Sequence, residues 1–132
     1  MKLVGIDIAK YEHAAFIMEA STGESLCDPF FFKNNKEGFK KLYTELNKYS
    51  KNELLIGMED TGHYNFAIES SLLAEGYKVA LINPITTKSL RKASLKSVKS
   101  DKEDALLITK ALLDKAYYRI ISILSLIHIW RC

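Results

Sequence analysis

The stretch Lys2–Ala9, which reads Lys-Leu-Val-Gly-Ile-Asp-Ile-Ala, decides the fold class. Its apolar and β-branched residues form a short continuous run, and such a run predicts a strand buried in the core. Asp7 lies inside that run. Because an ionised carboxylate is costly to bury unless it is paired or binds a metal ion, Asp7 is the first candidate functional residue.

Two further strands are expected directly after this one. His13–Ala20 predicts a strand, and Ser21-Thr22-Gly23-Glu24 predicts a turn in which Gly23 adopts the positive φ of a hairpin. Ser25–Phe32 predicts a third strand at an edge of the sheet, where Pro29 is tolerated. Three consecutive short strands with tight connections indicate an antiparallel meander.

The rest of the chain alternates between helical and strand patterns. Helices are expected at 35–49, 63–74 and 101–118, strands at 54–58 and 77–82, and a short helix followed by a loop between 84 and 100. Asn34 or Asn35 is expected to cap the first helix, and Gly76 to end the second. This order predicts an α/β protein of the ribonuclease H-like type, with a mixed five-stranded sheet flanked by helices. Right-handed crossovers would set the strand at 54–58 beside the first strand.

Length and composition exclude several classes of protein. The 132 residues are 48% hydrophobic and 27% charged, which is typical of one globular domain and excludes a disordered or collagen-like chain. Cys27 and Cys132 are too few for a disulfide framework or a zinc site. Because the first residues already predict a strand rather than a signal peptide, we expect a cytoplasmic protein with no membrane partner.

The end of the chain has a different character. Ile120–Trp130 is apolar, but its eleven residues are too few for a membrane span of about twenty, and a further strand is one interpretation. Leu124–Ile129 back-translates into a sequence like the adapters used in transposon-based library preparation, so we expect residues from about 124 onward to be read-through. The sequence therefore predicts a domain at 1–119 and an apolar, non-native tail at 120–132.

Four carboxylates besides Asp7 stand at informative positions. Glu59 and Asp60 follow the predicted strand at 54–58, and Asp101 and Asp104 are three residues apart at the start of the last helix, so they share one side of it. Oxygen ligands are what Mg²⁺ prefers, and two such ions stabilise both the attacking and the leaving oxygen in phosphodiester cleavage. Each acid also has a simpler structural role open to it: Asp101 as a helix cap, and the others as strand-end or exposed residues.

Three ordered segments resemble a known family. They are Gly5-Ile6-Asp7, Gly57-Met58-Glu59-Asp60-Thr61-Gly62-His63-Tyr64 and Lys99-Ser100-Asp101-Lys102-Glu103-Asp104-Ala105. Together they are similar to the DEDD transposases of the insertion-sequence 110 group, over roughly residues 1–118. The resemblance implies a RuvC-like domain in which Asp7, Glu59, Asp101 and Asp104 are the catalytic acids and bind Mg²⁺ or Mn²⁺.

The resemblance also implies partners. Members of the family act on DNA in transposition and recombination, are guided by a structured RNA, and carry a nucleophilic serine in a second, C-terminal domain. Nothing after Tyr118 resembles that domain, so we expect this chain to be the N-terminal fragment, inactive alone, of a protein that forms homo-oligomers. Within the middle motif, Tyr64 either stacks on nucleic acid or packs, and packing is the favoured interpretation. His63 is expected in an exposed loop.

The net charge of +3 is mild, but the basic residues cluster before the last helix. The candidates for nucleic-acid binding there are Lys88, Arg91, Lys92, Lys96 and Lys99. A solvated helix face is the simpler interpretation of such a run.

Two other functions remain open at this stage. A remnant that binds nucleic acid without catalysis would keep salt-dependent binding after loss of all four acids. An actin-like or sugar-kinase ATPase is suggested by Gly5-Ile6-Asp7-Ile8, but the sequence lacks that group's second glycine-rich phosphate loop.

Overall fold

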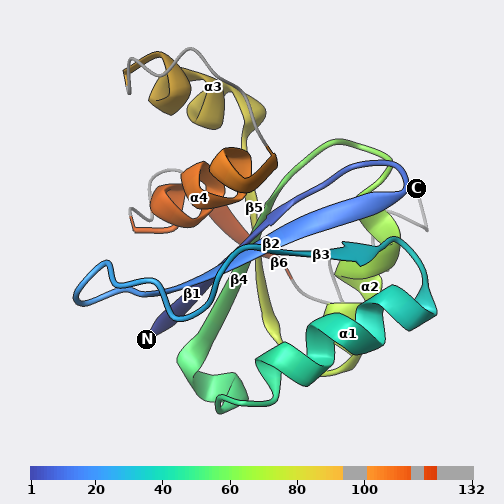
Figure 1. The fold of residues 1–132 in the computed structure, drawn as a ribbon. Coiled ribbons are helices and arrows are strands. Elements are labelled where there is room, and N and C mark those ends of the chain that lie inside the picture. Colours follow the sequence, from blue (N-terminus) through green and yellow to red (C-terminus); the bar gives the residue numbers. More distant parts are fainter. Residues whose placement is uncertain (94–100, 114–117, 122–132) are drawn as a thin grey trace.

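The computed structural model describes residues 1–93, 101–113 and 118–121, which form one mixed β-sheet with helices on both faces (Figure 1). The strands are β1 (Lys2–Asp7), β2 (Glu12–Glu19), β3 (Phe30–Lys33), β4 (Leu54–Glu59), β5 (Lys78–Ile82) and β6 (Tyr118–Ile121). The helices are α1 (Lys36–Leu46), α2 (Phe66–Ala74), α3 (Pro84–Ala93) and α4 (Asp101–Ala111), with a short 3-10 turn at Lys51–Glu53.

The strand order in the sheet is β3-β2-β1-β4-β5-β6. The first three strands form the antiparallel meander that the sequence predicts, and β4 pairs with β1 in parallel, as expected from right-handed crossovers. β5 continues the parallel part, and β6 is antiparallel to it. β1 is therefore a central strand, which explains its continuous apolar run.

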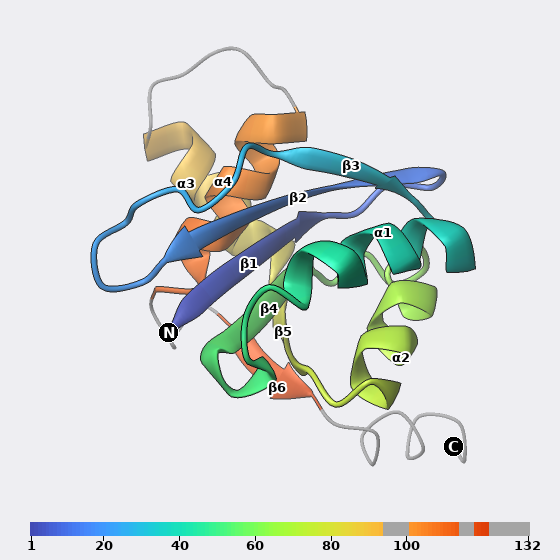
Figure 2. The same cartoon turned by 60° about the horizontal axis from the view of Figure 1, so that its bottom comes forward.

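Two hydrophobic layers hold the helices against the sheet. Side chains alternate between the faces of a strand, so neighbouring residues of β1 point into different layers. Ile6 packs in the layer under α1 and α2, together with Leu42 and Leu72, whereas Leu3 packs under α4 with Ile108. Figures 1 and 2 show α1 and α2 on one face and α4, with α3 beside it, on the other.

The five-stranded sheet expected from the sequence is a sheet of six strands in the described residues. The additional strand, β6, includes Ile120 and Ile121 at the start of the apolar tail. The last helix ends at Ala111, so its predicted extension to Tyr118 is wrong, and Tyr118 instead begins β6. Helical and strand periodicities are hard to distinguish in a short apolar run. Here the segment forms a strand because it pairs with β5.

Other boundaries differ by a few residues. β3 begins at Phe30, not Ser25, because Pro29 cannot donate to the ladder; Ser25 makes only an isolated bridge to Met18. The side chain of Asn35 accepts a hydrogen bond from the Gly38 backbone at 2.8 Å, which confirms it as the α1 cap. Gly76 has a φ of 89° and follows the end of α2, as expected.

Within the described segments, none of the helices combines the length and the apolar character that crossing a bilayer requires.

Candidate functional site: the carboxyl edge of β1 and β4

Asp7 and Glu59 are the last residues of two neighbouring parallel strands. β1 and β4 pair with Ile6 opposite Met58, and each strand ends one residue later. Hydrogen-bonded strands lie about 4.8 Å apart, so the register brings these two carboxylates to adjacent positions at one edge of the sheet. Two of the four acids singled out in the sequence are thus neighbours in space, although 52 residues (59 − 7) separate them along the chain.

Both carboxylates belong to the face of the sheet that α4 covers. Gly5 precedes Asp7 by two residues, and a Cβ added to Gly5 would overlap the side chain of Thr109 and the carbonyl oxygen of Ala105. Because side chains two apart share a face, Asp7 points to the same side as α4. Gly57 stands in the same relation to Glu59, and its added Cβ would overlap Leu112. The two glycines allow α4 to lie directly on the strands that end in the acids.

The direction of α4 brings its first turn towards the same edge. Figures 1 and 2 both show the helix beginning on the side where β1 ends and running back across the sheet. The helix begins at Asp101 and includes Asp104, but the side chains of these two residues lie outside the described part of the structure. The convergence of all four acids therefore stays a prediction. Among the described side chains, no three His, Cys, Asp or Glu residues come together.

A threonine that the sequence did not single out contacts Glu59. Thr87, on α3, is buried, and its hydroxyl donates a hydrogen bond to Glu59 Oε1. The same hydroxyl lies 3.0 Å from the carbonyl oxygen of Pro84, the first residue of α3. A fixed donor orients a carboxylate in the way that supporting residues orient metal ligands. The available signal was its position: Thr87 lies about one helical turn after Pro84, at which α3 begins two residues beyond β5.

Asp60 belongs to a separate hollow beside Glu59. The hollow has a volume of about 370 Å³ and is lined by Asp60, Asn83, Pro84 and Arg119, among others. Arg119 Nη2 lies 3.8 Å from Asp60 Oδ2, with both side chains largely exposed. Such an exposed pair contributes little to stability. Its consequence is local: it places a cation within reach of the carboxyl edge, from a residue that the sequence did not indicate.

The loop after Glu59 is held by a chain of polar contacts. Thr61 Oγ1 donates to Asn65 Oδ1 at 2.7 Å, and Asn65 Nδ2 lies 3.5 Å from Glu69 Oε1. Thr61 therefore contacts Asn65 and does not cap α2, which begins at Phe66. Burial of the Glu69 carboxyl, with a smaller contribution from the charge of Asp60, raises the pKa of Glu69.

The aromatic residues of this loop face solvent. Tyr64 is 45% exposed, so the favoured interpretation that it packs is wrong, and His63 is exposed as expected. Their ring centroids are 6.4 Å apart. Gly62 has a φ of 83°, a conformation that glycine adopts readily and that lets the chain turn sharply after the strand. Phe66, the first residue of α2, is 39% exposed.

A second buried polar group, His13, fixes the loop that follows Asp7. The Ala9 N–H donates to His13 Nδ1 at 3.1 Å, and the imidazole packs edge-on against Phe32. Because Nδ1 accepts, the neutral ring carries its proton on Nε2. Within the described residues, neither His13 Nε2 nor Asn34 Oδ1 makes a well-formed hydrogen bond. Burial lowers the pKa of His13 from 6.5, and its weak interaction with Asn34 opposes that shift.

His13 gives the fold a defined dependence on pH. Its pKa is lowered in the folded state, so the unfolded chain binds a proton more readily than the folded chain as the pH falls below about 6.5. We expect the contribution of His13 to the free energy of unfolding to be constant above pH 7 and to decrease as the pH falls from 6.5 to 5. Urea unfolding of the parent and of His13→Gln measures it: the variant is less stable at pH 7, but loses less stability on acidification.

His63→Gln is the matched control, because His63 is exposed. The raised pKa of Glu69 has the opposite effect, because it makes the folded state more stable as the pH falls. The test is therefore the difference in pH dependence between the parent and His13→Gln, and not the pH dependence of the parent alone. An equal loss of stability on acidification in the parent and in His13→Gln would contradict the expectation.

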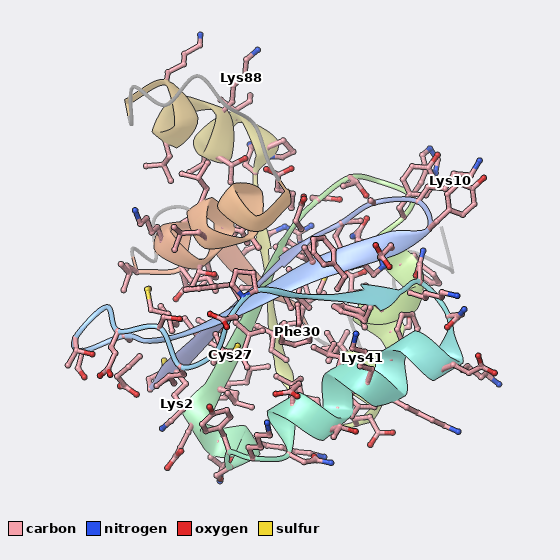
Figure 3. The ribbon with its side chains drawn as sticks, in the orientation of Figure 1. Lys2, Lys10, Cys27, Phe30, Lys41 and Lys88 are labelled. Atoms are coloured by element: carbon pink, nitrogen blue, oxygen red, sulfur yellow. The ribbon has the colours of Figure 1, made fainter. Side chains whose placement is uncertain are left out.

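The basic stretch is described only in part. Lys88 and Lys92 are exposed, one helical turn apart on α3. Figure 3 shows Lys88 projecting away from α4 into solvent. The side chain of Arg91 and the whole of Lys96 and Lys99 lie outside the described residues. Nucleic-acid binding by this stretch stays a prediction.

Comparison with known proteins gives consistent results. A family model described as a transposase, of the DEDD type found in insertion-sequence 110 elements, matches residues 4–125. The chain is 28% identical over 109 residues to the pilin gene-inverting proteins of Moraxella bovis and Moraxella lacunata. The matched region is 81% of this chain but 33% of either relative, so the chain spans about a third of their length.

The fold also matches a solved structure. T. thermophilus RuvC, in a structure with a Holliday junction substrate, superposes with a TM-score of 0.57 at 16% sequence identity. The match covers 83% of this chain and 90% of RuvC. At this level of identity the likeness concerns the fold, and it confirms the ribonuclease H-like, RuvC-like architecture expected from the order of the elements.

Proposed function

Because this chain belongs to the DEDD transposase family of the insertion-sequence 110 group, we propose that it supplies the acidic, divalent-metal-binding site of a DNA recombinase. The observation that carries the proposal is the placement of Asp7 and Glu59 at adjacent strand ends, on the face that α4 covers. Asp101 and Asp104, in the first turn of α4, are proposed to complete the set.

The donor chemistry fits Mg²⁺ or Mn²⁺. Hard divalent ions take carboxylate oxygens, and water and a phosphate oxygen would supply the remaining ligands. When bound, such ions polarise a phosphodiester and lower the pKa of an attacking water or hydroxyl. Asp7 and Glu59 would hold the ions, and Thr87 would keep the Glu59 carboxylate oriented.

Several partners belong to the same proposal. DNA is the proposed substrate, since the relatives are a transposase family and gene-inverting proteins. A guide RNA and a homo-oligomeric assembly are proposed for the longer protein, in which a second domain would bring a nucleophilic serine. Lys88, Arg91, Lys92, Lys96 and Lys99 are the proposed contacts to the nucleic-acid backbone. A cytoplasmic location belongs to the same proposal, because DNA is the proposed substrate.

Calorimetric titration of the chain with Mn²⁺ tests the metal site. We expect Glu59→Gln to weaken binding at least about tenfold, the lower bound for losing even a supporting partner of a metal ligand. Gln keeps an oxygen to accept the Thr87 hydrogen bond, so the fold is retained.

Asp60→Asn is the matched control for this titration. Asp60 is the next carboxylate along the chain, but it is exposed and lines the neighbouring hollow. Equal affinities in the parent and in Glu59→Gln would refute the metal site and favour a non-catalytic nucleic-acid-binding protein.

A further inference from the structure

The loop between β1 and β2 has a fixed backbone. The backbone N–H of Asn34 donates to the carbonyl oxygen of Tyr11 at 2.8 Å, and its side-chain amide donates to the carbonyl oxygen of Lys10 at 3.1 Å. On the other side, the Ala9 N–H donates to the buried His13 at 3.1 Å. Three hydrogen bonds, two from Asn34 and one to His13, therefore hold the backbone of residues 9–11. The side chains of Lys10 and Tyr11 extend from this fixed backbone.

Those two side chains point into solvent. Tyr11 is 74% exposed, and Lys10 Nζ lies 5.1 Å from the centroid of its ring. Figure 3 shows Lys10 projecting outward beyond the sheet. A similar pair at the opposite edge, Lys2 over Tyr49, has a structural use, because Tyr49 is partly buried against the core. The Tyr11 ring has no such packing among the described residues, so the core does not explain why an aromatic residue stands here.

The position of the loop indicates what the pair binds. Lys10 and Tyr11 follow Asp7 by three and four residues, at the edge where Asp7 and Glu59 meet. Exposed aromatic rings stack on unpaired bases of any sequence, and lysine neutralises the neighbouring phosphate. A base inside a duplex has both faces covered by its stacked neighbours and offers none to such a ring.

We propose that Lys10 and Tyr11 form a contact for single-stranded nucleic acid: the Tyr11 ring stacks on an unpaired base, and the Lys10 ammonium binds the adjacent phosphate. The contact rests on the proposed function and makes it more specific, because it requires an unpaired strand next to the acidic pair. The shared chemistry is an unpaired nucleobase with its phosphate, from either DNA or RNA.

Fluorescence titration with short oligonucleotides containing 2-aminopurine tests the contact. The three ligands are single-stranded DNA, single-stranded RNA and duplex DNA. Each is titrated in EDTA, so that metal ions do not contribute to the binding that is measured. We expect single strands to bind more tightly than the duplex, with the probe quenched. Tyr11→Ala should lose the quenching and about tenfold in affinity, whereas Tyr11→Phe keeps both. The preferred single strand identifies the source of the base.

Lys10→Ala tests the phosphate contact, with Lys78→Ala as its matched control. Lys78 is also exposed, but it is the first residue of β5 and so lies at the end of the sheet away from Asp7 and Glu59. Lys10→Ala should reduce the dependence of log affinity on log salt by about one, and Lys78→Ala should leave it unchanged.

Two results would overturn the contact: quenching and affinity in Tyr11→Ala equal to those of the parent, or duplex binding as tight as single-strand binding. If Tyr11→Ala loses quenching and affinity but the parent binds no Mn²⁺, the metal site is contradicted and the loop contact is not. Mn²⁺ binding without the Tyr11 effects would contradict the loop contact alone.

Discussion

Asp7→Asn is expected to remove the thermal stabilisation that Mn²⁺ gives to the parent protein. A ligand at about a hundred times its dissociation constant stabilises the folded state by about 2.7 kcal/mol, which for a domain of this size raises Tm by roughly 10 °C. Asp7 ends the central strand and lies beside Glu59. Asparagine has a similar shape but no charge, so the variant should fold and yet gain only a small fraction of that shift.

Thermal unfolding with and without Mn²⁺ measures this effect, with Asp28→Asn as the control. Asp28 is an exposed carboxylate in the connection before β3, outside the carboxyl edge. The control should keep the full metal-dependent shift. A shift in Asp7→Asn as large as that of the parent would leave the proposed site without its central ligand, whatever the affinity of the other acids.

Gly5→Ala is expected to be the most destabilising single-methyl change on the α4 face. The added Cβ would overlap the Thr109 side chain and would also meet two backbone atoms, the Ala105 carbonyl oxygen and the Thr109 nitrogen. Backbone atoms of a packed helix cannot yield as a flexible side chain can, so α4 must shift away from β1. Overpacking of this kind typically costs 1–3 kcal/mol, and we expect a loss of at least about 3 kcal/mol here. Urea unfolding measures it.

Two comparisons distinguish a clash with α4 from a general sensitivity of the fold to replacing glycine by alanine. The three atoms nearest to a Cβ added at Gly57 all belong to the Leu112 side chain, so Leu112→Ala should relieve much of the cost of Gly57→Ala, whereas Thr109→Ala should relieve little of the cost at Gly5. Gly23→Ala has open space around its Cβ but a φ of 73°, so it should cost only about 1 kcal/mol. Equal costs at Gly5 and Gly23 would contradict the close approach of α4.

How far the sequence predicts this fold differs from element to element. β1 was predictable because a short, continuous apolar run with one carboxylate near its end is typical of a central strand that leads into a functional site. The adjacency of Asp7 and Glu59 followed from the handedness of crossovers, a rule of topology that needs no side-chain detail. β6 was ambiguous because a short apolar run at the end of a helical pattern is stable in either form. Only its pairing with β5 decides that, and this contact is non-local.

The residues that support the site were harder to find. Thr87, Asn34 and Arg119 are ordinary polar residues in sequence, and each gains its role from a partner 24 to 59 positions away along the chain (Asn34 to Lys10, Thr87 to Glu59, Arg119 to Asp60). Polar partners that are distant along the chain leave no periodic pattern in the sequence. The acids were visible because charge inside an apolar strand is expensive, whereas a buried hydroxyl among apolar residues is common.

The hydrogen bond from Thr87 to Glu59 has a further consequence. It joins the helix that bears Lys88 and Lys92 to one of the two central acids. If a polyanion displaces α3 when it engages those lysines, the Glu59 carboxylate moves with the helix, and the affinity for the ion changes. Linkage is reciprocal, so the ion must alter the affinity for the polyanion by the same factor. Through one threonine hydroxyl, the proposed metal site and the proposed lysine contacts would share one free energy of coupling.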